Sequence, residues 1–291
     1  LDLVKDYGSE QSNSLPRARW VSHNDAYYDV FSAPIEPGEL LNDLLWQQCY
    51  AAICTSATLT VGGMFSRFLS QSGLDNTVEQ LRLVSTFNFP EVATLNVPDL
   101  VSDPRDYDAH TEEVAKLLPG LVHEDQSALI LFTSWRQLNG VIRLLPDSLS
   151  QLLLVQGDDA KQVLISRHRE NVLKGKSSFL VGLASFAEGL DLPGDLCRHV
   201  IIAKIPFAVP DDPIDQTVAE FLESQGRNPF YEMSLPDAAL KLVQACGRLI
   251  RNEHDYGKIT LLDNRIVTKS YGKLLLNTLP PYRRNIGSRI T

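Results

Sequence analysis

The stretch SALILFTSWRQLNGVIRLLP, residues 127–146, decides the fold of this chain. It begins with a continuous apolar run, passes through the hydroxyl pair Thr133 and Ser134, and ends in an amphipathic pattern. A run that is apolar on both faces is typical of a strand buried in a parallel sheet, whereas the pattern after it has the period of a helix. We therefore interpret the stretch as a strand, a short loop and a helix.

The same alternation recurs towards the C-terminus. Strands separated by helices predict a doubly wound α/β domain with a mainly parallel sheet that is covered on both faces. The further strands are expected at 151–157, 178–184, 198–207 and 258–264, and the helices at about 160–175, 213–225 and 235–252.

The first 75 residues follow a different pattern. RARWVSHNDAYYDVFSAP (17–34) predicts two strands joined by a turn at Asn24–Asp25, followed by a helix around 38–48 and an apolar strand at 50–59. These elements are too few for a domain with its own core. We interpret residues 1–75 as the tail of a preceding α/β domain.

Residues 76–291 are then the main domain. We expect 76–127 to be a bridging region and the basic end at 280–289 to be a solvated tail. The chain starts at Leu1 rather than at a methionine, which suggests a fragment or a processed piece.

The composition excludes several classes of protein. A net charge of −9 and a pI near 5.2 argue against a general polyanion binder, although they leave a local basic groove open. The apolar runs are too short to span a membrane, and no signal peptide is recognisable. We expect a cytoplasmic protein without a membrane partner.

The cysteines and histidines lack the spacing of a metal site. The four cysteines do not match a disulfide framework, a zinc site or an iron–sulfur site, and we interpret them as buried structural thiols: Cys49, Cys54, Cys197 and Cys246. The six histidines give no metal pattern either, and His168 between two arginines suggests a charged helix surface. We expect no metal ligands in this chain.

The stretch LVQACGRLIRNEHDYG, residues 242–257, carries an unusual basic stripe. On a helical wheel Gln244, Arg248 and Arg251 fall within about 60° of one another, and apolar residues cover most of the rest. A mostly buried helix with such a stripe needs an anionic partner, because an unpaired buried charge is costly. The nearest acid on the helix, Asp237, lies about four turns from Arg251. The partner is therefore in another element, in another domain, or not protein.

Two loops add polar groups after expected strands. SFAEGLDLPG, residues 185–194, places Glu188 and Asp191 around Gly189, which lets the backbone approach a ligand closely. A polar loop with a turn glycine is the alternative. Ser56 and Thr58 follow the strand at 50–59 and either cap a helix or contact a neighbouring domain, and Thr133 and Ser134 suit helix capping.

The triplet Gly-Lys-Ser in KGKSS, residues 174–178, is not a phosphate loop. Such a loop needs a glycine five residues earlier, where Glu170 stands, and it follows a strand and opens a helix. Here the triplet precedes a strand.

The order of four short motifs carries a family resemblance. "SAT", "FTSW", "EGLD" and "QxxGRxxR" resemble motifs III to VI of superfamily 2 helicases. The exact sequences of these motifs and their neighbours, "TSATL", "LVQGD", "FAEGLDLPGD" and "QACGRLIR", resemble those of the DinG branch of the XPD-like DNA helicases. This resemblance covers the chain from about Arg17 to Tyr282. The resemblance implies RecA-like domains, with motif III in residues 1–75 at the end of the first domain and motifs IV to VI in a second domain over 76–291.

The resemblance also implies roles for single residues. Arg251 would be the arginine finger on the γ-phosphate of ATP, with Arg248 beside it and Gln244 positioning the nucleotide or the interdomain contact. The remaining implied positions are the nucleotide-site residues Glu188, Gly189, Asp191 and Gly247, the coupling residues Ser56 and Thr58, and the contacts to single-stranded DNA at Thr133, Ser134 and Trp135.

Two departures from the family define what this chain can do. The phosphate loop and the acidic magnesium box of the first domain are absent, and so is the four-cysteine cluster. We expect the C-terminal part of a longer helicase that shares ATP and Mg²⁺ with a missing N-terminal helicase domain. An iron–sulfur cluster of the parent would lie outside this chain. Translocation from 5′ to 3′ is implied by the family, and the chain alone should not hydrolyse ATP.

Three other interpretations remain open. The chain could be a non-enzymatic α/β module that binds protein or nucleic acid through its basic stripe. It could be a small-molecule enzyme that uses Glu188 and Asp191 as an acid/base pair, but this leaves the arginines unexplained. The arginines could also simply pair with acids in the core.

Overall fold

The computed structural model describes residues 16–24, 26–122, 126–208 and 211–288. This part of the chain forms two compact units, which we describe separately. Unit 1 comprises the described residues up to Leu83 together with Phe207–Asp237, and unit 2 comprises Val84–Pro206 and the residues from Ala238 onwards. The assignment of 1–75 and 76–291 to two helicase domains stays a prediction.

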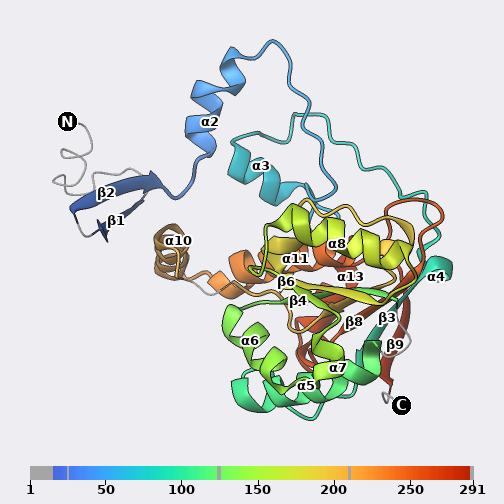
Figure 1. Ribbon diagram of the computed structural model, residues 1–291. Helices are drawn as coiled ribbons and strands as arrows, with labels where there is room; N and C mark the ends of the chain where they lie inside the picture. The colour runs from blue at the N-terminus through green and yellow to red at the C-terminus, as the bar shows by residue number, and fades with distance from the viewer. Residues whose placement is uncertain (1–15, 25, 123–125, 209–210, 289–291) are drawn as a thin grey trace. The chain divides into compact units, whose positions relative to one another are not determined.

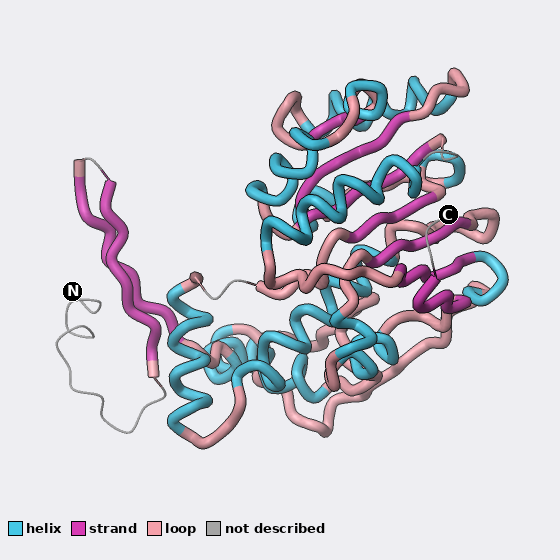
Figure 2. The backbone as a smooth tube through the Cα atoms, turned by 90° about the horizontal axis from the view of Figure 1, so that it is seen from below, coloured by secondary structure: helices cyan, strands magenta, loops and turns pink. Residues whose placement is uncertain are grey.

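Unit 2 is built on a seven-stranded sheet of order β5-β6-β4-β7-β8-β3-β9, in which every recorded strand pair is parallel (Figure 2). The predicted doubly wound α/β fold with a parallel sheet is confirmed. The strands are β3 (Ala93–Pro98), β4 (Ser127–Phe132), β5 (Leu153–Val155), β6 (Ser178–Leu183), β7 (His199–Ile202), β8 (Gly257–Leu261) and β9 (Arg283–Ser288).

Helices cover both faces of this sheet (Figure 1). One face carries α5 (Tyr107–Val122), α6 (Trp135–Leu144) and α7 (Asp147–Ser150). The other face carries α8 (Lys161–Leu173), α11 (Leu235–Cys246) and α13 (Gly272–Thr278). The short helices of this unit are α4 (Phe89–Val92), α9 (Ala184–Ala187), α12 (Arg265–Thr268) and the 3₁₀ turn η2 (Gly194–Leu196).

The central strand β4 explains why the sequence adopts this fold. All six of its residues are buried. Ala128, Ile130 and Phe132 belong to one core cluster with residues of α5 and α6, because alternate side chains of a strand point to the same face. The residues between them face the other helix layer, so a strand of this kind is apolar apart from a polar group with a hydrogen-bond partner, such as the Ser127 hydroxyl, which accepts from Arg198 N.

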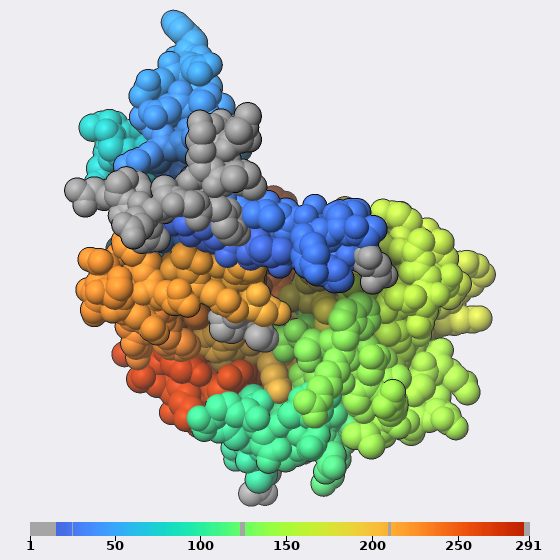
Figure 3. Space-filling view, turned by 90° about the vertical axis from the view of Figure 1, so that its left-hand side faces the viewer, coloured from blue at the N-terminus to red at the C-terminus, as the bar shows by residue number. Residues whose placement is uncertain are grey.

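Unit 1 contains the predicted hairpin. β1 (Arg17–Asn24) and β2 (Tyr27–Pro34) pair in antiparallel register, and the rings of Trp20 and Phe31 stack with centroids 4.9 Å apart. The predicted turn residue Asp25 lies outside the described residues. Helix α10 (Pro213–Ser224) packs along β1 (Figure 3).

The described part of unit 1 has four more helical segments, of which the first two confirm the helix predicted around 38–48. They are α2 (Gly38–Leu44), the 3₁₀ turn η1 (Trp46–Gln48), α3 (Ser66–Ser72) and the π-helix η3 (Phe230–Ser234). A Cβ on Gly73 would lie 1.9 Å from the carbonyl oxygen of Gly38, so only glycine permits this approach of α3 to α2.

The apolar strand predicted at 50–59 is wrong. Residues 51–56 have no regular structure, and the side chains of Tyr50 and Ile53 are exposed. A single strand is not stable without neighbours, and none of the described strands pairs with this segment.

Two segments that we expected to be irregular instead hold elements of the sheet. The bridging region 76–127 contains β3 and α5, and the predicted tail 280–289 contains β9. β9 lies at the edge of the sheet and pairs only with β3. Its polar residues Arg283, Arg284 and Asn285 can form this strand because the pairing uses the backbone alone.

The prediction of a charged surface at His168 is also wrong. His168 is fully buried, as are Leu164 and Val172 one helical turn to either side. Its Nε2–H donates to the Leu196 carbonyl (2.8 Å), and its Nδ1 accepts from the Ser178 hydroxyl (3.0 Å). The ring therefore joins α8 to β6 and η2.

The prediction of buried thiols holds for half of the cysteines. Cys197 and Cys246 are buried, whereas Cys49 and Cys54 are exposed. Burial raises the pKa of both buried thiols to about 12.

We predict that stability falls below about pH 6.5 because of buried neutral histidines. Burial lowers the pKa of His168 and of the fully buried His110. The unfolded chain then binds more protons than the folded chain, so the free energy of unfolding is constant above pH 6.5 and falls as the pH decreases further. Each unit of pKa depression corresponds to about 1.4 kcal/mol.

Urea unfolding between pH 7.5 and pH 5 measures this dependence. The His168→Gln variant should lose part of the pH dependence, whereas Gln162→Ala, which removes an exposed side chain of the same helix that does not titrate, should keep all of it. Identical pH profiles for His168→Gln and the unchanged protein would contradict the assignment.

Candidate functional site

The basic stripe of 242–257 does not lie on one continuous helix. Helix α11 ends at Cys246 instead of continuing to 252, and the backbone then tightens, with Arg248 N donating to Ala245 O (3.2 Å) and Leu249 N to Cys246 O (3.2 Å). Gln244 remains on α11 with an exposed side chain, whereas Arg248 and Arg251 lie in the segment that follows. Both the predicted helix end and the buried stripe are therefore wrong.

Arg248 and Arg251 nevertheless converge on one atom. Arg248 Nη1 donates to the carbonyl oxygen of Leu190 (3.1 Å), and Arg251 Nη2 donates to the same oxygen (2.7 Å). Leu190 lies in the loop 188–194, between Gly189 and Asp191. Unit 2 thus brings two of the predicted site segments together.

The two guanidinium groups are not neutralised by a carboxylate. Among the described residues neither has an ion pair, and the acid nearest along α11, Asp237, pairs with Arg67 within unit 1. Burial lowers the pKa of Arg248, and the charge of Arg251 lowers it further, against the opposing effect of Glu188 and Asp191. Two like charges that share one carbonyl repel each other, so an anion placed beside them would be attracted to both.

Two apolar side chains of the loop 188–194 are buried and anchor it to the core of unit 2. Leu190 and Leu192 are buried, whereas Glu188 and Asp191 are exposed. Gly189 has a φ of +70° and no atom within 4 Å of where a Cβ would stand. The glycine therefore serves the turn predicted for it, and the loop presents an open backbone surface.

Lys161 contacts this loop, and Gln156 contacts the end of the strand that precedes it. The Lys161 ammonium donates to the Glu188 carbonyl (2.5 Å) and lies 5.5 Å from the ring centre of Phe186. Gln156 Oε1 accepts from Leu183 N (2.8 Å) at the end of β6. Neither residue was predicted from the sequence, although Gln156 lies within the segment "LVQGD" and Lys161 follows it three residues later.

The segment Thr133–Trp135 follows β4 at the carboxyl edge of the sheet. Ser134 caps α6 as expected, since its hydroxyl accepts from Gln137 N (3.3 Å). The Trp135 side chain remains 43% exposed and lies beside the backbone of Gly157, which follows β5. Arg136 stacks over the ring of Tyr107 at 3.7 Å.

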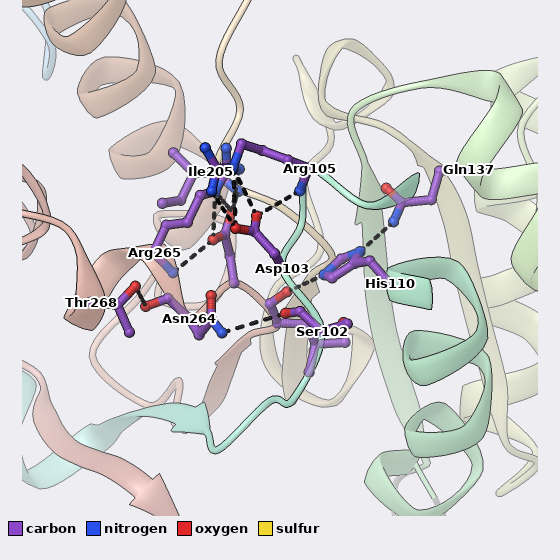
Figure 4. Close-up of polar contacts among 11 residues, drawn as sticks. Ser102, Asp103, Arg105, His110, Gln137, Ile205, Asn264, Arg265 and Thr268 are labelled. Atoms are coloured by element: carbon purple, nitrogen blue, oxygen red, sulfur yellow. Dashed lines mark hydrogen bonds and ion pairs between the residues drawn. The ribbon is translucent and has the colours of Figure 1, made fainter. Parts of the chain in front are cut away.

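A buried polar network lies under this edge (Figure 4). His110 Nε2–H donates to the Leu262 carbonyl (2.8 Å), and His110 Nδ1 accepts from the amide of Gln137 (2.8 Å). The network joins the start of α6 to the end of β8, so the loops of this edge are mutually fixed.

Asp263 and Asn264 make a second set of polar contacts with two more loops, and Figure 4 labels Ile205, Asn264 and Arg265 of this set. The buried Asp263 accepts from Ile205 N (2.8 Å) after β7 and pairs with Arg265 (2.6 Å). Asn264 donates to the carbonyl of Leu100 (3.2 Å) in the loop after β3. Both residues follow β8 with Leu262 in between, whereas the strand predicted at 258–264 had included them.

Unit 1 holds the predicted coupling residues. The hydroxyls of Ser56 and Thr58 lie 3.1 Å apart, and Thr58 N donates to Ser56 Oγ (3.1 Å). These contacts make a local turn and do not cap a helix. Their coupling role stays a prediction.

Three other features of the described residues bear on function. No group of three or more His, Cys, Asp or Glu side chains is arranged to hold a metal ion. None of the described helices has the length and apolar character needed to cross a membrane. The Gly-Lys-Ser triplet lies between the end of α8 and the start of β6, which is not the setting of a phosphate loop.

Comparison with known proteins gives one family. Residues 120–282 match the family described as helicase C-terminal domain. The chain is 41% identical over 286 residues to the ATP-dependent DNA helicase DinG of Photobacterium profundum, covering 95% of this chain and 41% of that protein. It is 36% identical over 282 residues to the ATP-dependent DNA helicase DinG of Escherichia coli (strain K12), covering 94% of this chain and 39% of that protein. The chain thus spans about two fifths of the length of these relatives.

Solved structures agree on the fold. One titled "XPD_Helicase" superposes with a TM-score of 0.65 at 19% identity, over 88% of this chain and 46% of that chain. One titled "Structure of S. tokodaii Xpd4" gives a TM-score of 0.60 at 15% identity, over 89% of this chain and 49% of that chain.

We predict that Gly182→Ala destabilises the protein by about 1–3 kcal/mol. A Cβ at this position would lie 2.6 Å from the ring of Phe186 and 2.8 Å from Gln156 Oε1, so the packing under the loop 188–194 must shift. Denaturant unfolding measures the loss. Gly189→Asn is the control, because it meets no atom and asparagine tolerates a positive φ, and it should cost much less. Equal losses for both variants would refute the steric explanation.

Proposed function

The chain belongs to the helicase C-terminal domain family, and from this premise we propose that it is the C-terminal motor portion of an ATP-dependent DNA helicase. In this proposal Arg251 is the arginine finger on the γ-phosphate of ATP. Arg248 lies beside it, and Gln244 positions the nucleotide or the interdomain contact. Glu188, Gly189, Asp191 and Gly247 line the nucleotide side of the site and link it to the DNA.

One observation carries the proposal. Arg248 and Arg251 donate to a single carbonyl oxygen and have no ion pair among the described residues. An arginine pair that merely stabilised the fold would be expected to meet carboxylates. A triphosphate supplies the missing negative charge, and phosphoryl transfer is catalysed largely by positioning and charge stabilisation.

The proposal assigns the remaining parts of the ATP site to sequence upstream. Residues 1–75 would be the end of the first RecA-like domain and 76–291 the second. The phosphate loop and the Mg²⁺ ligands would come from the N-terminal helicase domain, which is the partner of this chain. The relatives are longer than this chain and leave room for such a domain. An iron–sulfur cluster, where the parent carries one, would also lie upstream.

The proposed DNA track crosses the carboxyl edge of the sheet. Thr133, Ser134 and Trp135 would contact single-stranded DNA, with 5′ to 3′ movement as in the family, and Ser56 and Thr58 would couple hydrolysis to domain movement. The capped start of α6 and the exposed ring of Trp135 support this assignment. Free rather than paired cysteines among the described residues are in keeping with a cytoplasmic location.

We predict that Arg251→Ala, made in the full-length protein, lowers DNA-stimulated ATP turnover by about a thousandfold, because an arginine finger is worth about 10³–10⁵ in rate. ATP binding should be retained, since the finger acts mainly in the transition state. A phosphate-release assay with single-stranded DNA measures turnover. The isolated chain should hydrolyse no ATP.

Arg169→Ala is the matched control, because Arg169 is exposed on α8 and should leave turnover unchanged. Near-normal turnover of Arg251→Ala would reject the finger assignment. It would favour a non-enzymatic module that binds protein or nucleic acid.

We predict that Trp135→Ala weakens binding of single-stranded DNA by about 5- to 100-fold, since stacking on one aromatic ring contributes about 1–3 kcal/mol per base. Trp135→Phe retains a ring and should bind within a few-fold of the unchanged protein. Fluorescence anisotropy with a labelled oligonucleotide measures both affinities. Unchanged affinity of Trp135→Ala would place the strand elsewhere.

A further inference from the structure

Asp255 has no role in the proposal above, yet it is almost fully buried beside the arginine pair, with 2% of its surface exposed. Its carboxylate accepts three hydrogen bonds from backbone N–H groups. Oδ2 accepts from Arg251 (2.7 Å) and Asn252 (2.9 Å), and Oδ1 accepts from Gly194 (2.8 Å). These donors lie in two segments that are far apart in sequence.

The three hydrogen bonds of Asp255 join the turn after α11 to the loop 188–194. The bonds to Arg251 and Asn252 fix the turn after α11, and the bond to Gly194 reaches the far end of the loop 188–194. The same loop is held at Leu190 by both arginine side chains. Loop and turn are thus joined at Leu190 and at Gly194, and two attachment points prevent one segment from rotating against the other.

Both carboxylate oxygens of Asp255 are engaged by the backbone. Hydrogen bonds from N–H groups to an ionised carboxylate are short and strong, and they satisfy a charge that would otherwise be costly to bury. None of the hydrogen bonds of Asp255 reaches the Arg251 guanidinium. The carboxylate therefore fixes the backbone from which the guanidinium projects, and it leaves the side chain available for another anion.

We infer that Asp255 is a positioning residue, which holds Arg251 in register with the loop 188–194 through three backbone hydrogen bonds. The inference rests on the proposed function, in which Arg251 contacts the transferred phosphate. It adds a residue that acts through Arg251 without touching the nucleotide. A small displacement of Arg251 is enough to lower the rate, because a misplacement of about 1 Å can cost about 10²-fold.

The test is Asp255→Asn in the full-length protein. Asparagine has the same shape, but its amide turns an NH₂ group towards backbone N–H donors, so at least one of the three bonds is lost. We expect kcat for DNA-stimulated ATP hydrolysis to fall about 10- to 100-fold while KM for ATP stays within about threefold.

A double-mutant cycle separates positioning from a general effect on the fold. If Asp255 acts through Arg251, the variant Arg251→Ala/Asp255→Asn is no slower than Arg251→Ala alone, because a side chain that is absent cannot be misplaced. If Asp255→Asn caused only a general structural defect, the reductions in kcat of the two single variants would multiply in the double variant. Should Asp255→Asn fail to fold, Asp255→Glu retains the charge, displaces the carboxylate and enters the same cycle.

Two control variants complete the design. Asp195→Asn removes an exposed carboxylate of the same region, which pairs with Arg198, and should leave kcat unchanged. Ile201→Val trims a buried residue of β7 and lowers the melting temperature without reaching Arg251. It should leave kcat near normal at the assay temperature, whereas Asp255→Asn should not.

The outcomes distinguish the two proposals. A kcat of Asp255→Asn within about twofold of normal, or losses that multiply in the cycle, would overturn the positioning role while a strongly impaired Arg251→Ala upholds the arginine finger. Normal turnover of Arg251→Ala would overturn the proposed function itself. A lowered kcat with unchanged KM and no additivity supports the inference.

Discussion

The parallel register of the central strands is the constraint on which the rest of the structure depends. In a parallel sheet all carboxyl ends lie at one edge, so the loops after β4, β5, β6, β7 and β8 must meet there. The strands are buried on both faces, which leaves this edge as the place where polar groups from distant parts of the sequence can gather. The polar contacts of His110, Asp263 and Asn264 and the loop 188–194 both follow from that geometry.

The sequence predicted the centre of the sheet well and its margins poorly, for a physical reason. After their first serine, β4 and β6 carry no polar side chain because both faces are covered, and this pattern is visible in the sequence. β9 pairs through its backbone at an edge, so its polar sequence looks like a solvated tail. The apolar composition of 50–59 wrongly predicted a strand, because a strand is buried only where neighbouring strands pair with it, and composition does not reveal such neighbours.

The candidate site was predictable only in part, for a similar reason. Arg248 and Arg251 stand out in the sequence because their charges interrupt an apolar segment. The end of α11 at Cys246 is hidden, because Leu249 and Ile250 are buried beyond the helix and continue its apolar pattern. The acceptor shared by the arginines is the main-chain carbonyl of Leu190, which has no signature in a sequence. Asp255 resembles an ordinary turn residue until its three backbone donors are known.

The choice of acceptors has a consequence for an arginine that must reach a phosphate. A carboxylate partner would hold the guanidinium firmly, but it would also neutralise the charge that attracts the phosphate. A carbonyl oxygen orients the same group through a hydrogen bond and leaves its positive charge intact. In this site the carboxylate of Asp255 holds the backbone, whereas the carbonyl of Leu190 orients the side chains. This division lets the fold fix the backbone of Arg251 without a carboxylate on its guanidinium, which is the arrangement that the proposed arginine finger requires.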